Sequence, residues 1–198
     1  DEPEDLREEL REELGALFAS GDSTVIYATT EPGEALLLGG YTAVMDAGEL
    51  LQYGPTAEVF HNPKSLRVAR AFSDPPMNLM NATRQSTGVQ LLGGPLMALT
   101  LPSTSTPELT LGMRASAVRT HAQSGDIAIG GRVELAEISG SDTFVHVATG
   151  MGNLVAQLTG VHYFDLGAQV QVYVNPMQMY VFDAQGMLLL APTRTKGH

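Results

Sequence analysis

The 198-residue chain contains no cysteine, and its 11 lysine and arginine residues are outnumbered by 22 aspartate and glutamate residues. The absence of cysteine excludes disulfides, thiolate metal sites and cysteine nucleophiles. The formal net charge of −11 argues against non-specific binding to nucleic acid or to an anionic membrane surface. No apolar run approaches the length of a membrane span, and no signal peptide opens the sequence. With 43% hydrophobic residues, the chain is expected to fold as one large or two small domains.

A glycine-rich phosphate-binding loop with its lysine is also missing from the sequence. An α/β unit without this loop cannot hold a nucleotide in the usual way. Histidines are few and do not show the sequence spacing typical of metal ligands, so no metal site is expected among them. The five are His61, His121, His146, His162 and His198.

A change of pattern near residue 80 divides the chain into two predicted domains, 1–80 and 81–198. Expected helices and strands alternate before this point, which indicates an α/β unit. The helices are expected at 6–18, 32–38, 56–60 and 64–72, and the strands at 24–28, 41–46 and 49–54. The run 24–28 is continuously apolar, which is typical of a central strand. A proline-rich stretch at 73–78 is the expected linker.

After the linker, short apolar strands of period two are separated by Gly, Pro, Ser and Thr, a pattern typical of an all-β barrel or sandwich. The strands are expected at 89–92, 96–101, 110–113, 131–138, 143–149, 154–158, 169–174 and 179–183. The predicted fold class is therefore α+β overall, with a partial α/β unit followed by an all-β domain.

A Thr-Thr-Glu-Pro-Gly-Glu turn begins at Thr29, directly after the apolar run. Read by itself, this turn is a helix start in which Thr30 or Glu31 caps the helix, Pro32 occupies the first turn and Glu34 reaches back. Alternatively, a hydroxyl or carboxylate at the carboxyl end of a central strand faces the ligand crevice of an open α/β sheet. The two interpretations can hold together.

A carboxylate pair, Asp1 and Glu2, opens the sequence. One interpretation is an acidic, solvated chain end. The other is a magnesium site in which one carboxylate coordinates the ion and its neighbour positions an attacking water. Spacing alone does not separate the two.

Together these segments resemble the C-terminal half of an ATP-binding cassette (ABC) ATPase of the maltose-type sugar and polyol importer group, a P-loop NTPase. The segment 1–3 resembles the end of the Walker B strand, and 25–36 resembles the switch strand and H-loop. The hairpin 45–55 and the exit formed by 61–63 and 72–79 also match this group. Residues 111–114, 133–140 and 181–183 resemble its appended transport-associated (TOBE) domain, an OB-like β-module.

The resemblance implies that Glu2 and Thr30 occupy catalytic positions and that Asp1 lies at the nucleotide and binds Mg²⁺. ATP and Mg²⁺ are the implied cofactors of the full-length protein, and none is expected in this fragment. Implied partners are membrane permease subunits, a second ATPase subunit in a homodimer or heterodimer, and a small regulatory ligand, but no nucleic acid. The implied location is cytoplasmic, at the inner face of the cell membrane.

The sequence departs from the family pattern in two ways that bear on activity. The phosphate loop, Q-loop and signature motif normally lie upstream of Asp1, so the chain is expected to be an inactive N-terminal truncation of an ATPase. Thr30 stands where the family has the H-loop histidine, which predicts slow or no hydrolysis at this site. The alternative function is a non-enzymatic, ligand-sensing β-module of a transporter complex.

Overall fold

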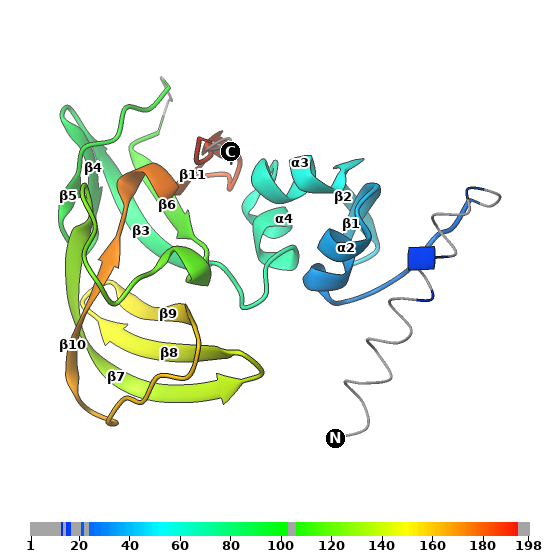
Figure 1. The fold of residues 1–198 in the computed structure, drawn as a ribbon. Coiled ribbons are helices and arrows are strands. Elements are labelled where there is room, and N and C mark those ends of the chain that lie inside the picture. Colours follow the sequence, from blue (N-terminus) through cyan, green and yellow to red (C-terminus); the bar gives the residue numbers. More distant parts are fainter. Residues whose placement is uncertain (1–12, 14, 17–20, 22–23, 103–105, 194–198) are drawn as a thin grey trace.

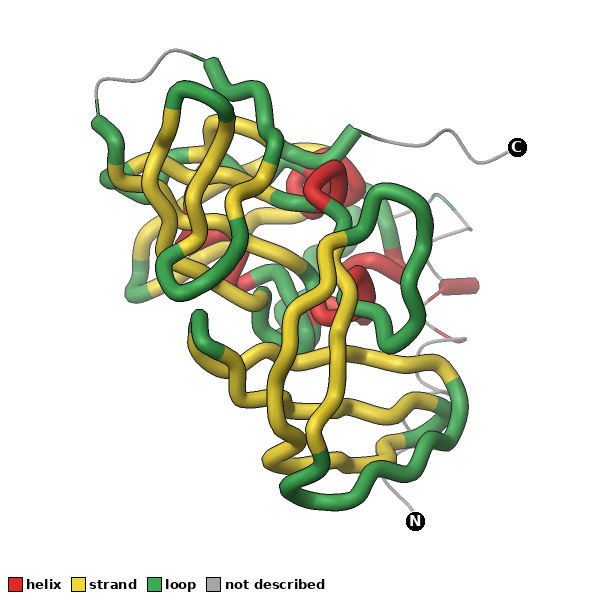
Figure 2. The backbone as a smooth tube through the Cα atoms, turned by 90° about the vertical axis from the view of Figure 1, so that its left-hand side faces the viewer, coloured by secondary structure: helices red, strands yellow, loops and turns green. Residues whose placement is uncertain are grey.

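The computed structural model describes residues 13, 15–16, 21, 24–102 and 106–193 (Figure 1). Strands make up far more of the backbone than helices do, and the helices are short (Figure 2). Of the predicted helix at 6–18, the described residues Glu13, Gly15 and Ala16 are helical. The predicted site residues Asp1 and Glu2 lie outside the described residues. No helix in the described ranges is long and apolar enough to cross a membrane.

The first described unit is a β-hairpin packed against short helices, and its elements confirm the predictions for 32–72. An apolar cluster of Val44, Val59, Val68 and Phe72 joins the inner face of the hairpin to the helices. The elements are α2 (Pro32–Leu38), β1 (Tyr41–Asp46), β2 (Glu49–Pro55), α3 (Thr56–His61) and α4 (Leu66–Ala71). Below we call these elements the helical unit.

The prediction of a central strand at 24–28 is wrong. Residues 24–29 belong to no strand, and the Ile26 side chain is 94% exposed. An apolar run becomes a strand only when neighbouring strands satisfy its backbone groups, and no described strand lies beside this run. The sheet of the helical unit is therefore a two-stranded antiparallel hairpin and contains no parallel pair.

The outer face of this hairpin is apolar. Tyr41, Met45, Leu50 and Tyr53 are each at least 60% exposed, and the rings of Tyr41 and Tyr53 stack with their centroids 5.6 Å apart. Continuous apolar surface of this kind is typical of a contact face.

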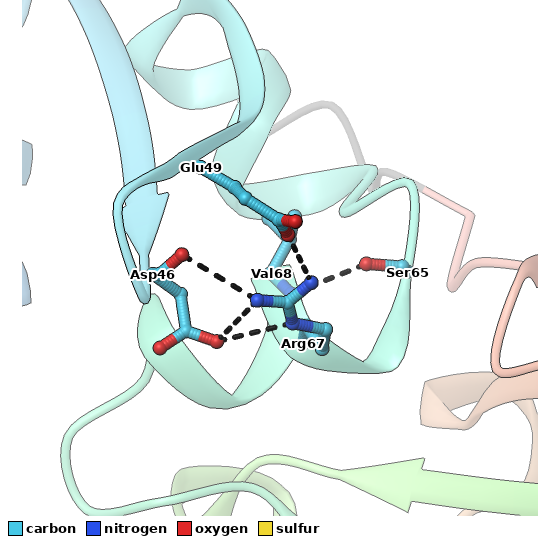
Figure 3. Close-up of polar contacts among 5 residues, drawn as sticks. All are labelled: Asp46, Glu49, Ser65, Arg67 and Val68. Atoms are coloured by element: carbon cyan, nitrogen blue, oxygen red, sulfur yellow. Dashed lines mark hydrogen bonds and ion pairs between the residues drawn. The ribbon is translucent and has the colours of Figure 1, made fainter.

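Arg67 of α4 fastens the helix to the hairpin turn (Figure 3). Its guanidinium donates to the Asp46 carboxylate at 2.9 and 3.0 Å and to Glu49 at 2.7 Å, and these two acids raise its pKa. At the start of the same helix, Val68 N donates to the Ser65 hydroxyl at 3.4 Å. Because Arg67 and both acids are about half exposed or more, the cluster fixes geometry more than it stabilises the fold.

The hairpin turn itself holds a residue in an unfavourable conformation. Ala47 has φ 49°, and Gly48 follows with φ 78°. A left-handed conformation costs about 1–2 kcal/mol for an ordinary L-residue, whereas asparagine adopts it readily. We expect Ala47→Asn to raise the free energy of unfolding by about 0.5–1 kcal/mol in urea titrations. The matched change Ala43→Asn, at an exposed strand position of the same hairpin, should bring no gain; an equal gain there would contradict this explanation.

The second unit consists of two antiparallel sheets around a shared core, which confirms the predicted OB-like β domain. One sheet has the order β12-β11-β6-β3-β4-β5 and the other β10-β7-β8-β9. Their inward-facing side chains form one apolar cluster that includes Met80, Leu111, Val145 and Val172. The elements are β3 (Asn78–Gln85), β4 (Gly88–Leu91), β5 (Leu96–Met97), β6 (Glu108–Met113), η1 (Ala115–Ala117), β7 (Ile127–Ser139), β8 (Asp142–Thr149), β9 (Gly152–Thr159), β10 (Gln169–Val174), η2 (Pro176–Gln178), β11 (Tyr180–Asp183) and β12 (Leu188–Leu190).

All eight strands predicted for this part are present, although the one expected at 96–101 ends at Met97. Two further strands, β3 and β12, were not predicted. β3 lies between β6 and β4 and begins inside the expected linker. Its sequence alternates weakly because small or polar residues, Asn78 and Ala82, occupy two of its buried positions.

Asn78 also joins the two sheets. Its side-chain amide donates to the Val155 carbonyl at 2.8 Å, and Val155 N donates to its carbonyl oxygen at 2.7 Å. The buried amide thus pairs with both backbone groups of Val155 on β9, an edge strand of the four-stranded sheet, as a neighbouring strand would.

Candidate functional site

The Thr29–Glu34 turn leads into α2 and is organised around a buried carboxylate. Glu34 accepts hydrogen bonds from the Tyr27 hydroxyl at 3.1 Å and from the Thr29 hydroxyl at 2.5 Å. Thr29 also accepts a hydrogen bond from Glu31 N at 2.9 Å. Within the described ranges, the Glu31 side chain makes no capping hydrogen bond, and Glu34 accepts from Tyr27 and Thr29 instead, so the predicted capping box is wrong.

Thr30 itself lies on the exposed bend between these hydrogen-bonded neighbours. Within the described part of the chain, its hydroxyl makes no hydrogen bond. The contacts of Tyr27, Thr29 and Glu34 therefore fix the backbone on both sides of Thr30 and leave its side chain facing solvent. Such a side chain is available to a ligand or to a second protein surface.

Of the predicted catalytic and metal-binding residues, the structure describes Thr30. Asp1 and Glu2 lie outside the described residues, so their distance to Thr30 stays untested. Among the residues with described positions, no group of three or more His, Asp or Glu could hold a metal ion. Asp1 as a ligand of Mg²⁺ therefore stays a prediction.

Arg114, at the end of β6, links the helical unit to the β part. Its Nη2 donates to the Phe60 carbonyl at 2.6 Å and its Nη1 to the Phe72 carbonyl at 3.1 Å. These carbonyls belong to the last turn of α3 and the residue capping α4, where helices present unpaired, partially negative oxygens. The guanidinium carbon also lies 3.5 Å from the centre of the Phe60 ring.

Burial lowers the pKa of Arg114, while the neighbouring Tyr180 opposes this shift. The guanidinium nevertheless stays charged at any ordinary pH because an arginine begins so far above it. Its Nε is buried and has no hydrogen-bond partner among the described residues. In the sequence, Arg114 ends the segment 111–114 that resembles the TOBE domain, and nothing local indicates these contacts.

Backbone pairing and apolar packing reinforce this junction. Leu66 N donates to the Gly186 carbonyl at 2.8 Å, and Leu188 N donates to the Lys64 carbonyl at 3.0 Å. The segment before α4 thereby pairs through its backbone with the β11–β12 hairpin. Beside it, Ala69 packs with Met77, Tyr180 and Phe182 in a buried apolar cluster. The helical unit is therefore fastened firmly to the β part.

A cavity of about 230 Å³ remains between α2 and the β part. Its lining includes Pro32 and Gly33, the first two residues of α2, so the cavity begins two residues after Thr30. Arg114 lines the same cavity. The helix start that follows Thr30 and the Arg114 junction therefore line one cavity.

Comparison with known proteins agrees with this architecture. A model of the TOBE domain matches residues 111–182. The sn-glycerol-3-phosphate import ATP-binding protein UgpC of Chromobacterium violaceum is 29% identical over 184 residues, covering 91% of this chain and 50% of its own length. The UgpC protein of Yersinia pestis is 30% identical over 193 residues, covering 94% and 53%. The alpha-glucoside transport ATP-binding protein AglK of Rhizobium meliloti is 28% identical over 174 residues, covering 83% and 48%.

Among solved structures, the molybdate-bound form of the cytoplasmic molybdate-binding protein ModG aligns with 52% of this chain and 94% of its own, at 17% identity and a TM-score of 0.43. The chain spans about half the length of the curated relatives that it matches. The resemblance stated from the sequence is confirmed: the chain corresponds to the C-terminal half of an ATP-binding protein of the ABC sugar-importer type and carries a TOBE domain.

Proposed function

We propose that this chain is part of the ATP-hydrolysing subunit of an ABC importer for a sugar, a polyol or a related solute. The observation that carries the proposal is the similarity to importer ATP-binding proteins over 83–94% of the chain. In this proposal, residues 1–80 complete a nucleotide-binding domain and residues 81–198 form a regulatory β domain. The whole protein binds ATP and Mg²⁺, pairs with a second ATPase subunit and works with a membrane permease at the cytoplasmic face of the membrane.

The finer part of the proposal concerns Thr30. The family resemblance implies a histidine that links the terminal phosphate to the attacking water and to the partner subunit. A threonine hydroxyl is shorter than an imidazole and cannot carry its positive charge, so it stabilises the developing phosphoryl charge less well. The exposed bend, held by Glu34 and Thr29, supports this role because it presents the side chain of Thr30 at a fixed place.

Asp1 and Glu2 complete the proposed site. Asp1 would hold Mg²⁺ and Glu2 would position the attacking water, as the resemblance implies. ATP turnover in this proposal also requires a phosphate-binding loop, which this sequence does not contain.

Calorimetry with Mg–ATP tests whether nucleotide binding requires the phosphate-binding loop that this sequence does not contain. We expect no binding heat when Mg–ATP is titrated into this chain, because backbone amides that cradle phosphates are lacking. The full-length protein should bind under the same conditions, which controls for the nucleotide and the buffer. Tight binding of Mg–ATP by the chain alone would contradict the proposal.

A second candidate function, the ligand-sensing β-module, is favoured by one observation. The cavity beside Arg114 lies between the β part and α2, where a bound molecule would contact both.

A further inference from the structure

Glu34, in the first turn of α2, is a charged residue that is only 9% exposed. One oxygen of its carboxylate, Oε2, accepts a hydrogen bond from the Thr29 hydroxyl at 2.5 Å and another from the Tyr27 hydroxyl at 3.1 Å. Hydrogen bonds to an ionised acceptor are stronger than bonds between neutral groups. The buried carboxylate therefore ties two residues of the irregular segment 24–29 to the start of α2.

The Thr29 hydroxyl passes this contact on to the backbone. A hydroxyl has one proton to donate and two lone pairs, and an ionised carboxylate can only accept. The Thr29 proton therefore points to Glu34, and a lone pair accepts the Glu31 N–H at 2.9 Å. The Glu31 carbonyl in turn accepts from Glu34 N at 3.2 Å. We call the connection from the Glu34 carboxylate through Thr29 to Glu31 N the Glu34 relay.

Thr30 is the central residue of the turn that this relay closes. A threonine hydroxyl bonded to the backbone amide two residues further on replaces a backbone turn. The side chain of Thr30 takes no part in the relay, so a different side chain at this position would be held in the same place. We propose that Glu34 is a positioning residue, which acts through Thr29 to fix the side chain at position 30.

Such a device is needed here because the segment 24–29 has no described strand beside it. Elsewhere in the chain, paired strands hold the residues at their ends, whereas this turn depends on side-chain hydrogen bonds. At a reacting phosphate, a misplacement of about 1 Å can cost about a hundredfold in rate. The catalytic consequence rests on the proposed function, but the hold of Glu34 on the turn does not.

The first test measures the turn in the chain itself, by ¹⁵N relaxation. The backbone order parameter of the Thr30 amide should be about 0.85 in the unmodified chain and below about 0.6 in Glu34→Ala. Glu34→Gln keeps a carbonyl oxygen that can accept from both hydroxyls, so the order should be retained. Glu31→Ala is the matched control, because it removes an exposed carboxylate next to Thr30 and keeps the backbone amide of the relay.

The second test measures ATP turnover of the full-length protein in the Thr30→His background. Glu34→Ala should lower kcat about tenfold and leave KM for ATP within about twofold, because positioning acts on the transition state more than on nucleotide binding. Glu34→Gln should restore most of kcat, and Glu31→Ala should leave kcat and KM within about twofold. A role of Glu34 in stability alone would not separate kcat from KM in this way.

An ordered Thr30 amide in Glu34→Ala would overturn the role of Glu34. So would an unchanged kcat of Glu34→Ala while Thr30→His still raises turnover, and in both cases the proposed function stands. If Thr30→His brings no gain, the proposed function fails and the catalytic purpose of Glu34 fails with it, while loss of order in Glu34→Ala would still show its hold on the turn. If Glu34→Ala does not fold, Thr29→Val removes the hydroxyl at the centre of the relay, with Thr29→Ser as its conservative control.

Discussion

Replacing Arg114 with alanine is expected to lower the free energy of unfolding by about 3 kcal/mol, because the change leaves two helix-end carbonyls unpaired and removes the group stacked on Phe60. Hydrogen exchange of the backbone amides in α3 and α4 should accelerate more than exchange within β7 and β8. Denaturant titration and hydrogen exchange measure the two effects.

Two variants control for the loss of charge. Arg114→Lys keeps the positive charge but cannot reach both carbonyls in the forked geometry of a guanidinium, so we expect it to recover only part of the stability. Arg132→Ala removes a half-exposed arginine whose nearest carboxylate, that of Glu134, is 3.7 Å away, and should change stability by less than about 0.5 kcal/mol. Equal effects of Arg114→Ala and Arg132→Ala would contradict the assigned role of Arg114.

Asn78→Asp is expected to be at least as destabilising as Arg114→Ala. At neutral pH it should lower the free energy of unfolding by about 3 kcal/mol or more. The substitution replaces the amide that donates to the Val155 carbonyl with a buried, charged oxygen facing that carbonyl. Burial and this repulsion raise the pKa of the introduced carboxyl in the folded state above its unfolded value of about 3.9. The folded state of the variant then binds a proton more tightly than the unfolded state, so its stability deficit should shrink as the pH falls through the folded pKa.

The control lies three residues further along the same strand. Asn81 is exposed, so Asn81→Asp should change stability by less than about 0.5 kcal/mol, with no comparable pH dependence. Unfolding in urea at a series of pH values measures both variants. A deficit of Asn78→Asp that stays constant between neutral and acid pH would show that the Val155 contact is not what the substitution disturbs.

Local sequence signals predicted those elements whose pairing is also local. The β1–β2 hairpin turns at Ala47 and Gly48, and its strands pair with each other. Most strands of the β part likewise pair with sequence neighbours and alternate clearly. The run 24–28 has an equally strong apolar signal, but a strand also needs neighbours, and sequence alone does not supply them. β3 shows the converse: its alternation is weak, yet pairing with β6 and β4 makes it an interior strand.

The candidate site was predictable only in part, for the same reason. The sequence placed Thr30 at a helix start because proline and acidic residues are local signals. The predicted capping box assigned the wrong partner to Glu34. Its carboxylate accepts a hydrogen bond from the Tyr27 hydroxyl instead of capping the helix. The contacts of Arg114 join it to carbonyls 42 and 54 residues away, and no local pattern encodes contacts of that range.

Steady-state ATP turnover of the full-length protein, with and without Thr30→His, tests the central claim most directly. We expect the histidine variant to hydrolyse ATP about tenfold faster or more, which corresponds to about 1.4 kcal/mol of transition-state stabilisation. Thr30→Ala, which removes the hydroxyl without adding an imidazole, should show no gain and controls for the loss of threonine. Turnover of Thr30→His equal to that of the unmodified protein would contradict the account that Thr30 occupies a catalytic switch position.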